Sequence, residues 1–316
     1  MLQKINFYVD LQYRYVGYTA TGVDDALVNY TFAKQWHFFN PKAGILYKVK
    51  PQHHLYVSYA MGNREPNRDD VLAALSQSKT VKPETMHDVE AGYKGIFTSG
   101  IVTSTLNLNY YLMQYEDQLV LTGKLNDVGN PIKENVPVSY RTGVELSGGI
   151  HFNHRWGTAE REYSRKIFSI NYSFAYSVNK IKSFDEYIYT YDDNYVAIDS
   201  LTQIIKHKNS NISFSPNIVA SLEVVAYPVS GLEISLMNKA VSKQYLDNTQ
   251  NETRKLGDYC TQDLRIAYQL LHKKHFSIKL SDHTIYNILH HNKITRKRLK
   301  NKYYPEKKKI KNQLES

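Results

Sequence analysis

The chain has 316 residues, 42% of them hydrophobic, and a formal net charge of +10. Its length fits one large all-β domain or two ordinary domains, and no run of about 18 apolar residues marks a transmembrane helix. The single cysteine, Cys260, excludes an internal disulfide framework and a cysteine-based zinc site. The start, MLQKINFYVDLQYRY, lacks the continuous apolar core and the cleavage site of a signal peptide.

The positive charge is concentrated in the C-terminal tail. Residues 291–316 hold ten Lys and Arg against two Glu, so the tail carries eight of the ten net charges. The apolar fraction is rich in tyrosine, with 27 Tyr against 11 Phe. Tyrosine suits half-buried strands and water–lipid boundaries, where the ring is apolar and the hydroxyl stays hydrated.

Alternation of apolar and polar residues begins at the fifth residue and returns along the chain. In residues 5–15, 88–94, 104–117 and 140–153, apolar side chains take one parity and charged or amide side chains the other, as in strands with one apolar face. The polar residues of these and later segments, which we predict to face a barrel lumen, are Asp10, Arg14, Glu90, Asn107, Asn109, Glu145, Glu223, Glu233 and Arg265.

Segment length and loop length together favour a membrane barrel. Several segments alternate over roughly 12 to 16 residues, which exceeds ordinary globular strands and suffices to cross a bilayer. The connections near 17–36, 62–84, 117–137, 180–213 and 247–257 are long and polar, whereas KPQHH, GIFTSG, PVSG and HKK are short and HRWGTAEREYSR is intermediate. We therefore predict an all-β fold: an antiparallel up-and-down transmembrane barrel segment of about eleven strands, with long extracellular loops and short periplasmic turns.

Three segments carry a family resemblance: FFNPKAGILYKVKPQHHLYVSYAMGNREPNRDDV, VKPETMHDVEAGYKG and YLDNTQNETRKLGDYCTQDLRIAY. In order and spacing they resemble the carboxy-terminal half of a TonB-dependent outer-membrane receptor, over roughly residues 3–289. The matching residues are Asn40, Pro41, Lys42 and Gly44, then Tyr56, Ser58 and Tyr59, then Arg64, Pro66 and Asp70, then Pro83 and Glu84, and finally Glu90, Gly92, Tyr93 and Lys94.

The resemblance implies half of a 22-stranded, plugged barrel in the cell outer membrane, a non-enzymatic receptor that imports a scarce ligand such as an iron chelate, cobalamin or a glycan. The implied partners are outer-membrane lipid, the plug and the front-half barrel strands, and the periplasmic energy-coupling TonB protein that pulls on the plug. The chain departs from the family pattern because it lacks the plug, the energy-coupling box and the final aromatic-ended strand. We therefore expect a truncated fragment that is inactive alone.

The loop NREPNRDDVLAAL is the candidate ligand contact at the outer mouth, although a solvated, internally paired loop is the competing interpretation. Its candidate residues are Arg64, Glu65, Asn67, Arg68, Asp69 and Asp70. The acidic pairs lack the spacing and glycine of a calcium loop, and no catalytic or phosphate-binding motif occurs. We expect no metal site, no cofactor and no catalytic residues.

Alternatives remain for the whole chain and for its tail. A soluble, Tyr-rich β-sandwich or adhesin that binds glycans would also keep charge off its apolar face. The tail, residues 290–316, reads as a basic, disordered or out-of-frame terminus, or as a segment that binds nucleic acid or anionic lipid. We favour the out-of-frame interpretation and expect no nucleic-acid partner.

Overall fold

The computed structural model describes residues 4–23, 29–76, 79–125, 131–158, 161–190, 201–270 and 276–282. All of them belong to the first of two units, Met1–Ile285. The predicted tail, 290–316, lies outside the described residues. No helix among the described residues is long and apolar enough to cross a membrane.

The described chain is almost entirely β-strand. Its elements are β1 Ile5–Val23, β2 Asn29–Lys50, β3 His53–Arg64, α1 Arg68–Ser76, β4 Glu84–Ser99, β5 Val102–Leu125, β6 Pro131–Thr158, β7 Arg161–Ile188, β8 Gln203–Asn211, β9 Ile218–Ala226, β10 Leu232–Val241, β11 Gln244–Tyr245, β12 Lys255–Leu256, β13 Tyr259–Leu270 and β14 Phe276–Asp282. Alternating β-branched and aromatic residues favour these strands because such side chains fit a pleated surface.

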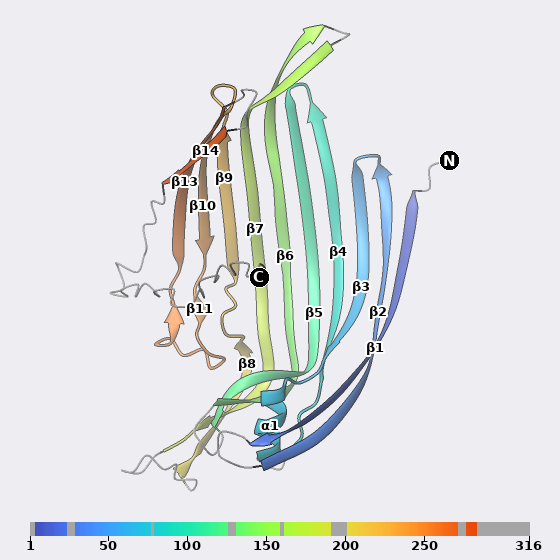
Figure 1. Cartoon of the computed structure of the whole chain (residues 1–316), viewed down its shortest axis with the longest axis vertical. Coiled ribbons are helices and arrows are strands. Elements are labelled where there is room, and N and C mark those ends of the chain that lie inside the picture. The colour runs from blue at the N-terminus through green and yellow to red at the C-terminus, as the bar shows by residue number, and fades with distance from the viewer. Residues whose placement is uncertain are drawn as a thin grey trace, which may run out of the picture. The chain divides into compact units, whose positions relative to one another are not determined.

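One antiparallel sheet holds all strands except β11 and β12, which pair only with each other. Its order is β1-β2-β3-β4-β5-β6-β7-β9-β10-β13-β14, and β8 pairs with β7 beside this path. Neighbours in sequence are therefore neighbours in space, as the colour order of Figure 1 shows. The predicted up-and-down antiparallel sheet of about eleven strands is confirmed.

The two ends of the sheet differ in how its strands are connected. At the turn end, residues 51–52 join β2 to β3 and residues 100–101 join β4 to β5. At the loop end, helix α1 lies between β3 and β4, and the small pair of β11 and β12 lies between β10 and β13. Short connections at one end and elaborated ones at the other agree with the predicted sorting.

The predicted loops are shorter than we expected because strand pairing continues through much of them. β1 and β2 stay paired out to Val23 and Asn29, within the expected loop 17–36. β5 and β6 stay paired out to Leu125 and Pro131, within the expected loop 117–137. The intermediate connection HRWGTAEREYSR is likewise a paired hairpin out to residue 158. Backbone hydrogen bonding extends these strands where side-chain alternation has faded.

One buried apolar cluster lies in these strand extensions. It consists of Val120, Val136, Ile181, Phe184 and Ile212, all under 9% exposed. The residues come from β5, β6, β7 and the segment after β8. The loop end therefore folds around its own apolar cluster.

Candidate ligand-contact surface

Pairing registers define two faces of the sheet, because residues directly opposite each other on antiparallel strands point to the same side. Asn109 lies opposite Gly92 on one side and opposite Glu145 on the other. Following every register across the sheet, one face carries Asp10, Arg14, Glu90, Asn107, Asn109, Glu145, Glu223, Glu233 and Arg265. We call it the polar face; it brings together all nine residues that we predicted to line a lumen.

The opposite side, which we call the apolar face, exposes large hydrophobic side chains. A single row across eight strands consists of Phe7, Ile45, Val57, Ala91, Tyr110, Val144, Tyr176 and Ile218. Val57 is 54% exposed and Tyr110 is 48% exposed. A contiguous apolar surface of this extent marks contact with lipid or with another apolar surface.

The polar face is internally hydrogen-bonded. The Tyr56 hydroxyl donates to Asn109 Oδ1 over 2.9 Å, and the Asn109 amide donates to Glu90 over 3.4 Å. Asn171 donates to Glu223 over 2.9 Å, and Arg265 pairs with Glu233. Tyr56 also borders two neighbouring hollows of about 610 and 300 Å³. The face therefore offers hollows lined with both donors and acceptors.

Three of the six predicted loop residues form ion pairs with residues outside the loop. Arg64 lies 2.8 Å from Glu84, and Glu65 lies 2.7 Å from Arg14. Asp70 lies 3.0 Å from Lys133 of β6. Burial raises the pKa of Glu65, but the hydrogen bond and charge of Arg14 outweigh burial and hold this pKa below its ordinary value. The Arg14–Glu65 ion pair therefore joins the predicted lumen-facing residues to the predicted loop residues, because Arg14 belongs to the polar face and Glu65 to the loop.

Asn67 and Asp70 together form the cap of helix α1. The Asn67 side chain accepts a hydrogen bond from the Asp70 N–H over 2.8 Å, and the Asp70 carboxylate accepts one from the Asn67 N–H over 3.3 Å. This reciprocal arrangement is a capping box. Arg68 and Asp69 pair with each other over 3.6 Å and have exposed side chains. The charged candidates with exposed side chains are therefore Arg64, at 70%, together with Arg68 and Asp69.

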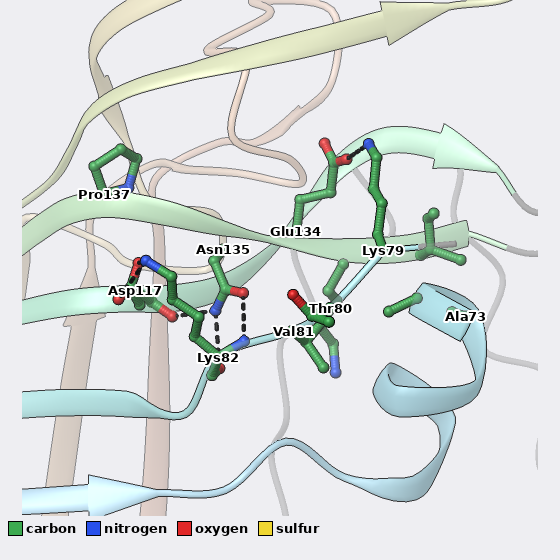
Figure 2. Close-up of a pocket in the computed structure, with 12 residues that line it drawn as sticks. Ala73, Lys79, Thr80, Val81, Lys82, Asp117, Glu134, Asn135 and Pro137 are labelled. Atoms are coloured by element: carbon green, nitrogen blue, oxygen red, sulfur yellow. Dashed lines mark hydrogen bonds and ion pairs between the residues drawn. The ribbon is translucent and has the colours of Figure 1, made fainter. Parts of the chain in front are cut away.

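A cavity of about 430 Å³ lies between α1, the segment before β4 and the extensions of β5 and β6. Figure 2 shows that Lys79 reaches toward Glu134 and Lys82 toward Asp117, in different directions. The Asn135 amide donates to the carbonyl oxygens of both Lys82 and Asp117 and accepts from the Lys82 N–H. These ion pairs and hydrogen bonds hold the loop against the β5–β6 hairpin around this cavity.

Sequence reasoning missed helix α1 and the cavity beside it. The helix had a local signal, Asn67 followed three residues later by Asp70 and then by VLAAL, because that spacing is typical of a capped helix start. The cavity had none, because Lys133 and Glu134 lie within the segment near 117–137 that was expected to be loop. Among the described residues, no group of three or more His, Cys, Asp or Glu could hold a metal ion.

Solved structures similar to this chain include receptors and transporters. The siderophore receptor PiuA from Acinetobacter baumannii matches with a TM-score of 0.57 and 15% identity, covering 87% of this chain and 39% of its own. The copper transporter OprC matches with a TM-score of 0.59 and 12% identity, covering 86% and 38%. The ferric citrate transporter FecA, in its unliganded form, matches with a TM-score of 0.56 and 17% identity, covering 85% and 36%. At these identities the likeness concerns the fold.

This chain spans well under half the length of those three structures. No curated protein sequence matches it. A family model described as "TonB dependent receptor-like, beta-barrel" matches residues 3–283, which is most of the chain. Together with the single antiparallel sheet, this match shows that the chain belongs to the TonB-dependent receptor β-barrel family.

Proposed function

We propose that this chain forms part of the wall of an outer-membrane barrel that takes up a scarce ligand, with no enzymatic activity of its own. The observation that carries the proposal is the separation of the two faces, with exposed Val57 and Tyr110 on one side and Glu90 and Glu145 on the other. In a membrane barrel the apolar face meets lipid and the polar face lines the lumen.

An iron chelate is the favoured ligand, with cobalamin or a glycan as the other classes. The similar structures include a siderophore receptor and a ferric citrate transporter. The loop end supplies Arg68 and Asp69, and the polar face supplies the hollows beside Tyr56. Such a surface suits a polar ligand with several acceptor groups.

The proposal includes further strands and a plug. Within the described sheet, β1 pairs only with β2, and β14 pairs only with β13. Unpaired backbone groups cost several kcal/mol each in hydrocarbon, so a membrane sheet must close. We propose that barrel strands and a plug outside this chain complete the lumen and that the plug couples uptake to the TonB protein.

Ferric citrate uptake by cells that supply the TonB protein tests the proposal. We expect no uptake by the 316-residue chain alone, and uptake by a complete receptor whose barrel contains this sheet. In that receptor, Glu90→Gln with Glu145→Gln should change the rate of uptake, while Asp69→Asn should change apparent affinity. Ferric citrate entry through the isolated chain would refute the need for further strands. Recovery of the chain as a soluble monomer without detergent would refute the membrane assignment.

A further inference from the structure

Two tyrosine–histidine pairs lie on the apolar face near the loop end. The Tyr13 hydroxyl is 2.6 Å from His37 Nδ1, and the Tyr59 hydroxyl is 2.9 Å from His87 Nδ1. Both hydrogen bonds are exposed, and Tyr13 is itself 64% exposed. Hydrogen-bonded imidazoles are out of place in an otherwise apolar surface, so their height along the strands is informative.

The two histidines lie at similar distances along their strands from the turns that end those strands. His37 precedes Pro51, in the β2–β3 turn, by fourteen residues, and His87 precedes Gly100, in the β4–β5 turn, by thirteen. Strands β2 and β4 both run from the loop end to the turn end, and each residue advances by about 3.3 Å. The two distances therefore agree within one residue.

The strand registers then place polar side chains level with His87. His87 lies opposite Gln114, Gln114 opposite Tyr140, and Tyr140 opposite Lys180. We call the set His37, His87, Gln114, Tyr140 and Lys180 the border row.

The surface changes character on either side of the border row. The next apolar-face pair toward the turns is Val89 with Leu112, both exposed. The next residues toward the loops include Thr85, Glu116 and Lys182. The border row therefore marks where the hydrophobic band ends.

The border row presents hydrogen-bond donors. A phenol is a stronger acid than neutral imidazole, so Tyr13 and Tyr59 donate to Nδ1 and each Nε2 carries a proton. Gln114 adds an amide, Tyr140 a hydroxyl and Lys180 an ammonium, and the row itself contains no carboxylate.

We propose that the border row binds the phosphate groups of membrane lipid headgroups. The inference rests on the proposed function, in which lipid tails cover the apolar face. Tails that cover Val89 and Leu112 place their headgroups at the end of the hydrophobic band, which is the level of the row. A phosphate supplies only acceptor oxygens and negative charge there, which complements two imidazoles and an ammonium.

Lipid titration of the full chain in non-ionic detergent micelles tests the proposal by native mass spectrometry. The probes are dihexanoylphosphatidylglycerol and, as the phosphate-free counterpart, dihexanoylglycerol. The border variant carries His37→Phe, His87→Phe and Lys180→Met. The matched control carries His54→Phe and Lys48→Met, which lie opposite each other on the polar face.

The border variant should bind the phospholipid about tenfold more weakly, because charge-assisted hydrogen bonds are lost. It should bind dihexanoylglycerol like the unmodified chain, and the control should match the unmodified chain with both probes. Two single variants serve if the border variant fails to fold. Lys180→Gln should weaken phospholipid binding, whereas Lys180→Arg should bind the phospholipid like the unmodified chain. Equal phospholipid binding by the border variant or by Lys180→Gln overturns the proposal, and so does equal loss with both probes. The membrane assignment would survive either result, since it rests on the apolar band.

Discussion

Gly92 lies beneath the ring of Tyr56, its direct partner on the neighbouring strand. A Cβ atom at position 92 would be 2.5 Å from Tyr56 Cζ and 2.6 Å from the Leu108 carbonyl oxygen. The ring can move, but the carbonyl belongs to the backbone of β5. Gly44 differs, because the nearest atoms to its Cβ position all belong to the Tyr8 side chain, which is 52% exposed.

These two glycines give a matched pair of substitutions. Gly92→Ala should destabilise the sheet by about 1 to 3 kcal/mol, because overpacking there must displace backbone. Gly44→Ala should stay within about 0.5 kcal/mol, because an exposed ring moves aside. Guanidinium unfolding in detergent, followed by tyrosine fluorescence, measures both. Equal costs would show that the ring, and not the Leu108 carbonyl, sets the strain.

Leu108 and Asn107 test which face meets lipid. Leu108 lies on the apolar face, 43% exposed, and is about midway between the border row and the β4–β5 turn. Leu108→Arg should cost about 2 to 4 kcal/mol because it places a charge in hydrocarbon. Asn107→Arg should be tolerated on the polar face.

The measurement is the fraction of heat-modifiable, folded protein in the membranes of cells that express a complete barrel containing this sheet. Both variants add one arginine to adjacent positions of the same strand, so each is the other's control. Equal losses would reverse the assignment of the faces.

Glu84 joins the start of β4 to the extension of β5. Its side chain is 7% exposed, and Oε1 accepts hydrogen bonds from the buried Leu119 N–H and from Arg64, each over 2.8 Å. Glu84→Ala should cost about 1 to 3 kcal/mol because it leaves a buried N–H without a partner. Arg64→Ala should cost about 0 to 1 kcal/mol, since the Arg64 side chain is 70% exposed.

The measurement compares the denaturant midpoints of Glu84→Ala and Arg64→Ala. Glu84→Gln serves as a control that keeps an acceptor oxygen. A larger loss in Arg64→Ala than in Glu84→Ala would show that the ion pair, not the backbone hydrogen bond, holds the two strands.

The loop after β3 should separate ligand contact from helix capping. Asn67→Ala removes the cap of α1 and should cost about 0.5 to 2 kcal/mol without a direct effect on ligand contacts. Arg68→Gln should leave stability within about 0.5 kcal/mol, because its side chain is exposed. In a complete receptor, Arg68→Gln should weaken ferric citrate binding in calorimetry. The ligand assignment of the loop is wrong if only Asn67→Ala alters that affinity.

Glu252 gives the loop between β10 and β13 a defined pH response. Hydrogen bonds from Lys255 and Tyr245 lower the pKa of Glu252 from 4.5 to about 2. A depressed carboxyl pKa stabilises the loop above the unfolded value, and that stabilisation is lost as pH falls from about 4.5 to about 2. Hydrogen exchange at the Leu246 and Arg254 amides, which are bonded within this loop, should speed up over that range after correction for intrinsic rates. Glu252→Gln should remove this pH dependence.

The faces could be predicted from the sequence because side-chain direction in a strand has a period of two. A segment such as residues 104–117 shows that period directly, and pairing then places Asn107 and Asn109 with Glu145. The ends of the strands could not be predicted this way. Around Phe184 the residues covered by protein and those exposed to water do not alternate along the strand. The side-chain pattern therefore stops there, although strand pairing continues.

The candidate site was predictable in part. The ion pairs between Arg14 and Glu65 and between Asp70 and Lys133 connect residues far apart in the sequence. No local pattern specifies such partners, because each depends on how the loop folds back over the sheet. The composition of the loop indicated a polar surface, but not which of its residues stay exposed.

Strand β6 passes through two different surroundings, and two of its valines differ in exposure accordingly. Val144 is 39% exposed on the apolar face, whereas Val136, eight residues away with the same parity, is 2% exposed inside the loop-end cluster. In the proposed barrel, lipid contact stabilises Val144, whereas exclusion of water stabilises Val136. A charged residue at position 144 would therefore obstruct entry into the bilayer. At position 136 it would loosen the outer loops of a barrel that has already inserted.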